Sequence, residues 1–172
     1  MITIREAREA DIPVLLTIYN HVILNTTAVY TYEAQSLEAR KTWYEDKRKA
    51  GYPIYVAEEA GQVIGFSSYG PFRAWPAYKY TIENSVYVAE GQRGKGVGKL
   101  LIRPLIESAR AKGYHAIIAG IDASNDASIR LHASFGFLQV ANFKQVGYKF
   151  GRWLDLVFME LLLDTPEHPE EG

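Results

Sequence analysis

The sequence predicts one α/β domain, and three observations support this fold class. First, 172 residues with 48% hydrophobic content can bury one sizeable core but leave little room for two. Second, segments with strand periodicity alternate with segments of helical periodicity. Third, no repeat or internal linker interrupts them. We expect the domain to cover residues 1–163 and to be followed by a flexible Pro- and Glu-rich tail over residues 164–172.

The first half of the chain predicts a strand, two helices and a hairpin. Ile2 and Ile4 alternate with polar residues, as in a short strand. Asp11 is a candidate N-cap for a helix with Pro13 in its first turn, where the missing N–H is harmless. Ser36 is the candidate cap of the next helix. The helices are expected at residues 11–24 and 36–51, and the hairpin strands at residues 53–58 and 63–69.

The second half predicts a strand, a long helix, another strand, a short helix and two closing strands. The long helix begins near Gly96, and its apolar residues recur at the spacing of one buried stripe. Pro104 lies inside it, so we expect a kink and not a break. Gly113 suits the left-handed residue that ends a helix. The other elements are expected at residues 81–88, 116–121, 124–136, 137–149 and 153–162.

The composition argues against several classes of function. Nineteen Lys and Arg against 20 Asp and Glu give a formal charge of −1, without the basic excess that a nucleic-acid binder uses to neutralise phosphates. With no cysteine and four scattered histidines, no thiolate or metal site is expected. No apolar run approaches the ~18 residues of a membrane span, and the N-terminus is too charged for a signal peptide. We therefore expect a cytoplasmic protein that binds neither nucleic acid nor membrane.

The most informative segment is a glycine-rich loop between a strand and the long helix. Residues 85–100 read Ser-Val-Tyr-Val-Ala-Glu-Gly-Gln-Arg-Gly-Lys-Gly-Val-Gly-Lys-Leu. Glycine lets the backbone approach a ligand closely, and a helix N-terminus adds free N–H donors and a partial positive charge. The cations Arg93, Lys95 and Lys99 complete a site that suits a phosphate or pyrophosphate. A merely flexible loop is the alternative.

Two common phosphate-binding motifs do not fit this loop. Gly91 and Gly96 have the spacing of a P-loop, but Val97 stands where that motif requires lysine. The dinucleotide-binding motif is one residue too long for this loop, and Lys99 occupies the place of its last glycine. The phosphate ligand must therefore belong to another class.

Residues 93–98, Arg-Gly-Lys-Gly-Val-Gly, resemble the Arg/Gln-x-x-Gly-x-Gly signature of the GCN5-related N-acetyltransferase (GNAT) superfamily, in which the loop holds the pyrophosphate of acetyl-CoA. The resemblance covers nearly the whole chain and implies a single-domain α+β fold with a mixed central sheet flanked by helices. It is closest to the phosphinothricin and methionine sulfoximine acetyltransferase branch. The matching segments are residues 18–20 with 25–27, residues 125–137, and the Lys-Phe-Gly-Arg-Trp-Leu-Asp run of residues 149–155.

The resemblance also implies which residues contact acetyl-CoA. The backbone of residues 86–88 would pair with the pantetheine arm, and the amides of residues 94–99 would bind the pyrophosphate. Asn125 would lie near the thioester, unless it only caps its helix. The cofactor-binding residues implied are Val86, Tyr87, Val88, Arg93, Gly94, Lys95, Gly96, Val97, Gly98, Lys99, Asn125 and Ser134.

Acetyl transfer to an amine requires a neutral amine, a stabilised oxyanion and a departing thiolate. An amine with a pKa near ~8 or above is largely protonated at pH 7, so a general base accelerates the reaction. The resemblance implies Glu83 as this base, and a solvated strand carboxylate is the alternative. A backbone N–H at Val88 or its neighbour is the expected oxyanion donor. His132 stands where many superfamily members place a tyrosine that protonates the thiolate, and a packed structural histidine is the alternative.

Two segments match the substrate-binding residues of the branch, and they comprise Arg73, Ala74, Trp75, Glu83, Asn84 and Ser85. Arg73 suits a carboxylate because its planar fork can bind one through two hydrogen bonds, although it can also be a surface cation. Phe72 and Trp75 are candidates for an apolar wall. Relatives often have Asp-Trp at residues 71–72 and His at Asn84, so the acceptor amino acid stays open.

The prediction is therefore an acetyl-CoA-dependent N-acetyltransferase that acts by direct attack in a ternary complex. Its acceptor would be the α-amine of a small amino acid or analogue, such as phosphinothricin, methionine sulfoximine or methionine sulfone. The alternatives are a non-catalytic acyl-CoA sensor and an acetyltransferase for polyamines or protein N-termini. Glu83 favours an enzyme over a sensor, and Arg73 favours a carboxylate-bearing acceptor. The family implies a homodimer, and we expect Arg152 and Asp155 to form a structural ion pair.

Overall fold

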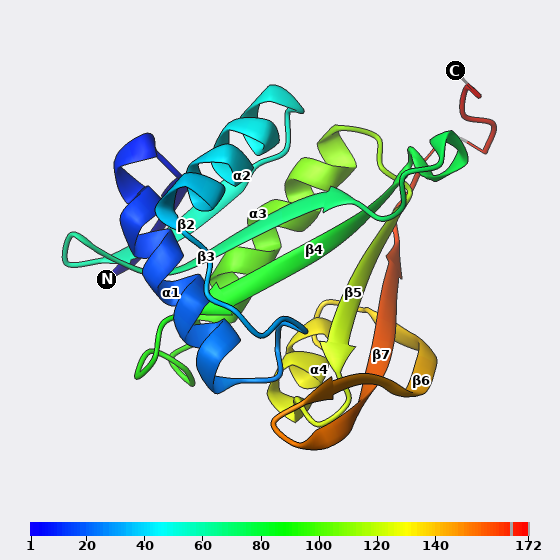
Figure 1. The fold of residues 1–172 in the computed structure, drawn as a ribbon. Helices are drawn as coiled ribbons and strands as arrows, with labels where there is room; N and C mark the ends of the chain where they lie inside the picture. Colours follow the sequence, from blue (N-terminus) through cyan, green and yellow to red (C-terminus); the bar gives the residue numbers. More distant parts are fainter. Residues whose placement is uncertain (166, 172) are drawn as a thin grey trace.

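The computed structural model describes residues 1–165 and 167–171, and its centre is one mixed seven-stranded sheet (Figure 1). The strand order is β1-β2-β3-β4-β5-β7-β6, and every neighbouring pair is antiparallel except β4 and β5. The strands are β1 Ile2–Glu6, β2 Ile54–Glu59, β3 Gln62–Pro71, β4 Thr81–Val88, β5 Ala116–Asp122, β6 Leu138–Lys149 and β7 Arg152–Leu162. The predicted fold class is confirmed.

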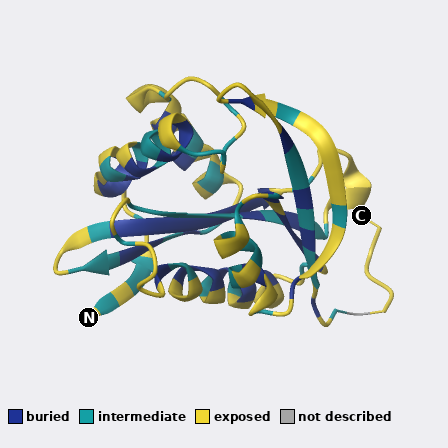
Figure 2. Ribbon diagram, turned by 90° about the horizontal axis from the view of Figure 1, so that it is seen from below, coloured by how far each residue is buried: buried dark blue, intermediate teal, exposed yellow. Residues whose placement is uncertain are grey.

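Helices cover both faces of this sheet. Helices α1 and α2 pack on one face, and α3 and α4 lie on the other (Figure 2). Their bounds are α1 Ile12–Asn25, α2 Leu37–Lys49, α3 Val97–Ala111 and α4 Asp126–Ala133, with short 3₁₀ turns at Glu9–Asp11 and Pro76–Tyr78. All four helices are predicted from the sequence, and α3 continues through Pro104 without a break, as expected.

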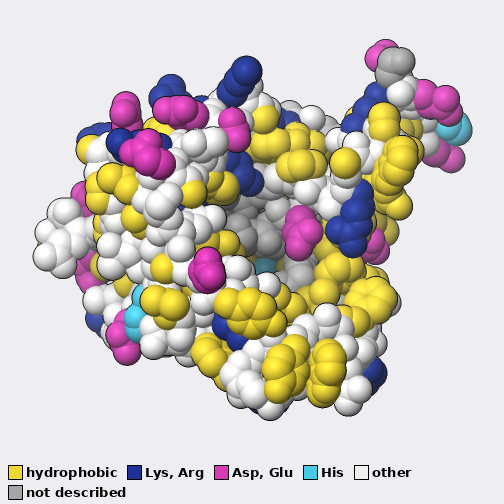
Figure 3. Space-filling model, in the orientation of Figure 1, with side chains coloured by type: hydrophobic (Ala, Val, Ile, Leu, Met, Phe, Trp, Pro, Cys, Tyr) yellow, Lys and Arg dark blue, Asp and Glu magenta, His cyan; other side chains and the backbone are white. Residues whose placement is uncertain are grey.

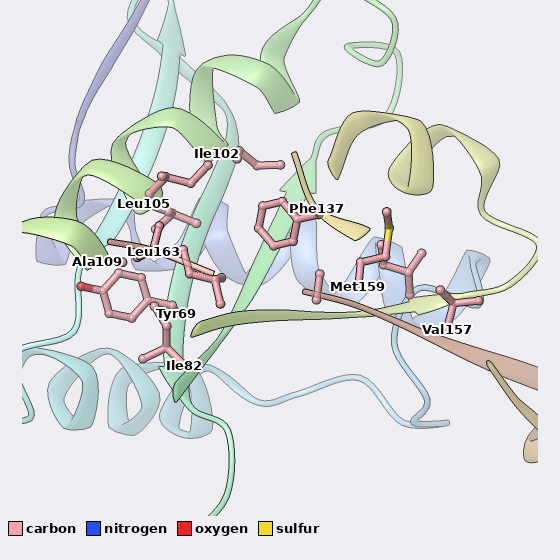
Figure 4. Close-up of a cluster of buried hydrophobic side chains, with 13 residues drawn as sticks. Tyr69, Ile82, Ile102, Leu105, Ala109, Phe137, Val157, Met159 and Leu163 are labelled. Carbon is pink, nitrogen blue, oxygen red and sulfur yellow. The ribbon is translucent and has the colours of Figure 1, made fainter. Parts of the chain in front are cut away.

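Alternation along the central strands builds a core on each face of the sheet. On β3, Phe66 packs against α1 and α2, whereas its neighbour Ser67 faces α3 and donates to the Leu101 carbonyl at 3.0 Å. On the α3 face, Leu105 and Phe137 belong to the cluster shown in Figure 4. Because the central strands are buried on both faces, they form a rigid base for anything that binds at their ends.

The predicted helix ends are confirmed in two cases and wrong in one. The Ser36 hydroxyl accepts from the Ala39 N–H at 3.1 Å and caps α2. Gly113 has a φ of +74° and ends α3 in the left-handed region. The Asp11 carboxylate does not cap α1, because the Arg5 guanidinium binds it at 2.7 Å and 3.0 Å. Such charge-assisted double contacts are stronger than a bond to one backbone N–H.

The parallel pairing between β4 and β5 is short and leaves a gap. It joins Thr81–Glu83 to Ala116–Ile118, after which the two strands diverge (Figure 1). On its other side, β4 stays paired with β3 to its last residue. The Ala89 N–H donates to a β3 carbonyl at 2.9 Å, and in an antiparallel pair only alternate residues make such bonds. The backbone N–H groups of Val86 and Val88 therefore point away from β3, into the gap.

The connection between α1 and α2 is docked on the hairpin formed by β6 and β7. The buried ammonium of Lys149 donates to the carbonyl oxygens of Ile23 at 2.5 Å, Thr26 at 2.8 Å and Val29 at 2.9 Å. The Tyr30 hydroxyl donates to a backbone carbonyl of β7 at 3.0 Å. These bonds hold residues 26–30 over the end of the gap, at the C-terminal end of α1.

The ion pair predicted between Arg152 and Asp155 is wrong, because Asp155 pairs with Lys144 instead. The Lys144 ammonium lies 3.1 Å from the Asp155 carboxylate, which also accepts from the Gln145 N–H at 2.9 Å. A break in the β6–β7 register, with Gln145 at a φ of +53°, brings this segment of β6 over Asp155.

The C-terminal boundary of the domain stays a prediction. β7 ends at Leu162, and residues 166 and 172 of the expected tail lie outside the described residues. Two contacts connect the tail to the domain: Thr165 lies 2.7 Å from the His115 ring nitrogen, and the Glu170 carbonyl accepts from a tyrosine hydroxyl at 2.7 Å. In the described part of the chain, none of the helices combines the length and the apolar character needed to cross a bilayer.

Lys149→Met tests the docking of the α1–α2 connection. The variant leaves three carbonyls without their donor, so the free energy of unfolding should fall by about 1–3 kcal/mol. Chemical denaturation followed by circular dichroism measures the change. Lys144→Met in the same hairpin is the matched control and should have little effect, because its ion pair is largely exposed. Equal effects of the two variants would contradict the proposed role of Lys149 in holding the α1–α2 connection.

Candidate functional site

A groove of about 580 Å³ runs along the gap at the end of β4. Its walls are the last residues of β4, the glycine-rich loop, the first turn of α3 and one side of α4, with Val22 and Ala28 on the side of α1. The face of the molecule drawn in Figure 3 is hollowed, and side chains of both charges lie around the hollow.

The glycine-rich loop turns its backbone toward the groove. Gly94 and Gly96 both have a φ of +80°, in the left-handed region that favours glycine. Gly96 is the N-cap of α3 and has no side chain to satisfy the free N–H groups of the first turn. At Gly98 a Cβ would lie 2.8 Å from the end of the Leu131 side chain, so glycine lets this side chain of α4 pack against the first turn of α3. The loop therefore presents unshielded N–H donors and the positive end of α3 to one ligand.

The β4 backbone supplies a second row of donors, and it corrects one expectation. The N–H groups of Val86 and Val88 point into the gap, where an extended ligand can pair with them as a further strand would. The N–H of Tyr87 points to β3, so the backbone pairing predicted for Tyr87 is wrong. Tyr87 instead contributes to the lining of the groove. A phosphate-bearing, amide-containing chain such as coenzyme A fits this donor set.

The structure brings together the predicted cofactor residues with one exception. Lys95 is not part of the lining, and its ammonium donates to Gln92 at 2.8 Å. Asn125 does both jobs considered for it, since its carbonyl oxygen accepts from the Ser128 N–H at 3.2 Å to cap α4 while the residue lines the groove. The predicted residues that line the groove are Val86, Tyr87, Val88, Arg93, Gly94, Gly96, Val97, Gly98, Lys99, Asn125 and Ser134.

A second cavity of about 260 Å³ adjoins the end of the groove that is farther from the glycine-rich loop, and Glu83 is part of its lining. The residues shared by the two cavities are Ala28, Val86, Tyr87, Asn125 and Ser128. The predicted substrate residues Glu83, Asn84 and Ser85 line this second cavity. The groove and the cavity thus form one continuous path along β4.

Glu83 has the environment of a general base. Burial raises the pKa of its carboxyl group, and the nearby charge of Arg73 partly opposes this shift. Its Oε1 leans toward β5, 3.1 Å from the position of a Cβ at Gly120, so the glycine makes room for it. A carboxylate with a raised pKa binds a proton more readily than an exposed one, which suits proton removal from an ammonium.

His132 is placed as a structural residue, and the predicted role as a proton donor to the thiolate lacks support. The ring is buried, and Nδ1 lies 2.8 Å from the Ser128 carbonyl oxygen while Nε2 lies 3.1 Å from the Asn84 amide nitrogen. A carbonyl requires a donor and an amide N–H requires an acceptor, so the proton belongs on Nδ1. Burial lowers the pKa of His132 and favours this neutral form. Nε2 then has no proton to give.

The loop before β4 places Arg73 near Glu83, but neither Arg73 nor Phe72 lines the groove or the second cavity. Arg73 is close enough for its charge to act on Glu83, and it stacks on Phe72 with 4.3 Å to the ring centroid. Phe72 in turn packs edge-on against Phe158 of β7, with 6.0 Å between centroids. The structure does not bring Ala74 and Trp75 to either cavity, and Trp75 is 75% exposed because it lies at the start of a 3₁₀ turn. Phe72 also lines neither cavity, so the predicted apolar wall stays a prediction.

Sequence reasoning missed the contribution of residues 28–30. Ala28 lines both cavities, and Val29 and Tyr30 line the second. This segment lacks periodicity, and its position depends on Lys149 at the far end of the chain. The sequence signal that could have indicated this was the run at residues 149–155. It matches the family closely but lines neither cavity, which suggests that it positions another segment.

Comparison with known proteins agrees with this geometry. Residues 17–137 match the model of the Acetyltransferase (GNAT) family. The chain is 46% identical over 168 residues to the L-methionine sulfoximine/L-methionine sulfone acetyltransferase of Salmonella typhimurium, with 98% of each chain covered. It is 37% identical over 162 residues to the phosphinothricin N-acetyltransferase of Streptomyces coelicolor, with 92% of this chain and 95% of the relative covered.

A solved structure of an acetyltransferase from Salmonella typhimurium with its cofactor acetyl-CoA superposes on this one with a TM-score of 0.96. The two chains are 46% identical, and the match covers 98% of each. The family model matches more than half of the chain, and the relatives cover nearly all of it. The chain therefore belongs to the GNAT family of acetyltransferases.

Proposed function

We propose that this protein transfers the acetyl group of acetyl-CoA to the α-amine of a small amino acid. The observation that carries the proposal is the continuous path along β4, from the donor-lined groove to the cavity that contains Glu83. The proposed acceptors are those that the relatives are named for: methionine sulfoximine, methionine sulfone and phosphinothricin. Acetylation would make the cell resistant to such analogues where they are toxic.

The residues of the groove hold and orient the co-substrate. The glycine-rich loop and the N-terminus of α3 bind the pyrophosphate, and the N–H of Val88, which is the gap-facing donor of β4 nearer to the loop, pairs with the pantetheine arm. When bound, acetyl-CoA supplies an activated acetyl group as a thioester. The N–H of Val86 points into the gap closer to Glu83, and we assign this donor, in place of the predicted Val88, to the negative charge that develops on the reacting carbonyl oxygen.

The second cavity handles the acceptor. Glu83 removes a proton from the ammonium, directly or through one water molecule, and the amine then attacks the carbonyl carbon. The C–N bond forms and the C–S bond breaks, and the sulfur leaves with the electron pair as a thiolate. The second proton that the nitrogen loses as it becomes an amide passes to this thiolate or to solvent. A thiol with a pKa near ~8.5 is a reasonable leaving group without an acid, which agrees with the neutral His132. Arg73 binds the α-carboxylate close to Glu83.

We also propose that the protein is a homodimer in the cytoplasm. Large apolar side chains on the β6–β7 hairpin are exposed, and such a patch is typical of an interface. They are Leu138, Val140, Phe143, Val146, Tyr148, Phe150 and Trp153. Light scattering measures the molar mass directly, and a value near that of one 19.4 kDa chain would contradict the dimer.

An acceptor panel tests the proposed function. Release of free thiol from acetyl-CoA should be fastest with methionine sulfone, methionine sulfoximine or phosphinothricin, because each offers an α-amine beside a carboxylate. Polyamines and peptides serve as competing acceptors. Faster release with either of them would contradict the acceptor class but not the acetyltransferase activity. Tight binding of acetyl-CoA with no release for any acceptor would favour a sensor.

Glu83→Gln should lower kcat/KM by about 10²- to 10⁴-fold with little change in the affinity for acetyl-CoA. In the wild type, activity should fall as the pH drops through the raised pKa of Glu83, because only the ionised carboxylate accepts a proton. The variant should lack this acidic limb. Glu107→Gln, at an exposed position of α3, is the control. A pH profile that keeps its acidic limb in the variant would remove Glu83 from the mechanism.

Gly96→Val should weaken acetyl-CoA binding at least tenfold in calorimetry, since valine disfavours a φ of +80° and shields the N–H groups around it. Gly61→Val in the β2–β3 turn is a matched control. Gly61 also has a positive φ, of +77°, and open space around it, but lies outside the groove. Similar losses of affinity in both variants would show that general destabilisation is the cause.

A further inference from the structure

Helix α2 places two basic side chains on the face of the sheet that carries Glu83. Arg40 is 2% exposed, and its guanidinium lies between the rings of Tyr19 and Trp43, at 4.0 Å and 4.5 Å from their centroids. Lys47 lies two helical turns further on and is half-buried. Among the residues that the structure describes, no carboxylate comes within 4.0 Å of either side chain. Two positive charges therefore share one wall without a protein anion.

Lys47 keeps unused donor capacity. Its ammonium donates to the Tyr69 carbonyl at 2.7 Å and lies 5.5 Å from the ring centroid of Tyr52. An ammonium has three donors, and this carbonyl uses one of them. Burial, together with the charge of Arg40, lowers the pKa of Lys47 to about 8. The Tyr69 carbonyl and the rings of Trp43 and Tyr52 stabilise this half-buried cation in part, and an anionic oxygen atom would stabilise it further.

The strand register places this ammonium at a defined distance from the base. Gly70 of β3 is the direct cross-strand partner of Glu83, so a Cβ at Gly70 would be on the same face and about 5 Å from the Cβ of Glu83. Lys47 Nζ lies 2.8 Å from that Cβ position, and thus within about 8 Å of the Glu83 Cβ. The Glu83 carboxylate leans the other way, toward Gly120 of β5. The Lys47 ammonium therefore lies above β3 and the Glu83 carboxylate leans toward β5, on the same face of the sheet and on either side of β4.

This separation suits the two ends of an amino-acid acceptor. The α-carboxylate is adjacent to the amine and must lie near Glu83, where Arg73 is placed. The sulfur or phosphorus atom of an extended side chain lies about 5 Å from the amine nitrogen. Its oxygens reach farther, toward β3 and α2. With the amine at Glu83, the oxygen-bearing end of the side chain comes within reach of Lys47.

We propose that Lys47 is a specificity-determining residue whose ammonium binds the sulfone, sulfoximine or phosphinate oxygens of the acceptor side chain. The inference rests on the proposed function and extends it from the α-amino and α-carboxylate groups to the rest of the acceptor. Arg40 is enclosed by aromatic rings and does not touch the acceptor, but its charge makes the wall attractive to negative oxygen atoms. An apolar side chain such as that of methionine would leave the Lys47 ammonium without this partner.

The experiment compares methionine sulfone with methionine as acceptors for the wild type and for Lys47→Met. Wild-type kcat/KM should be higher for the sulfone, and the variant should lose about 10- to 100-fold for the sulfone with little loss for methionine. Lys41→Met, at an exposed position of the same helix, is the matched control and should keep the wild-type preference. Calorimetric affinity for acetyl-CoA, which should be unchanged, shows that each variant is folded. Lys47→Gln replaces Lys47→Met if the latter fails to fold, since glutamine can still donate to the Tyr69 carbonyl.

The outcomes separate this inference from the proposed function. An unchanged preference for the sulfone in Lys47→Met or Lys47→Gln would overturn the role of Lys47 and leave the proposed function intact. Equal losses for both acceptors would also overturn it, because they would indicate a general structural role. If the wild type acetylates neither of these acceptors and neither methionine sulfoximine nor phosphinothricin, the proposed function and the inference both fail.

Discussion

The divergence of β4 from β5 is the constraint on which the rest of the site depends. A sheet normally satisfies the N–H groups of an inner strand through both neighbours. Here β5 leaves β4 after three residue pairs, so the alternate N–H groups of β4 lose a protein partner in the middle of the molecule. The fold tolerates this only if something else bonds to them, and an extended ligand with amide groups can do so.

The other parts of the site follow from that gap. α3 begins directly after β4, so its N-terminus and the glycine-rich loop stand at one end of the gap and bind anions there. Glu83 is the last β4 residue that still pairs with β5, and therefore stands at the other end. When the pyrophosphate of acetyl-CoA is bound at the loop and its pantetheine arm lies along β4, the thioester is therefore directed toward Glu83. The α1–α2 connection, held by Lys149, covers the junction between them.

Local patterns were sufficient to predict the fold and the groove. The helices and strands are predicted by the periodicity of their own residues. The groove is predicted by glycines directly before the start of a helix. Each of these signals lies within a short stretch of sequence. The failures arise where a distant residue decides the outcome. Arg5 binds the Asp11 carboxylate, and Lys144 forms an ion pair with Asp155. Asn84 and Ser128 together determine which ring nitrogen of His132 carries the proton.

The acceptor side was harder to predict for the same reason. Trp75 and Phe72 look equivalent as aromatic residues of one loop, but Phe72 packs on Phe158 whereas Trp75 is exposed, and neither lines the second cavity. Lys47 appears in the sequence as one of several charges on a polar helix. Its position over Gly70 depends on how α2 crosses β3, which no local pattern encodes. The sequence therefore predicts where the coenzyme lies more completely than what receives its acetyl group.

Amide hydrogen exchange with and without acetyl-CoA tests the central claim most directly. The N–H groups of Val86 and Val88 have no strand partner across the gap, so they should exchange readily in the free protein. Bound acetyl-CoA should slow exchange at Val86 and Val88 and in the first turn of α3, while Tyr87, bonded to β3, should change little. Protection confined to another part of the protein, or no protection at Val86 and Val88 at saturating acetyl-CoA, would contradict the account.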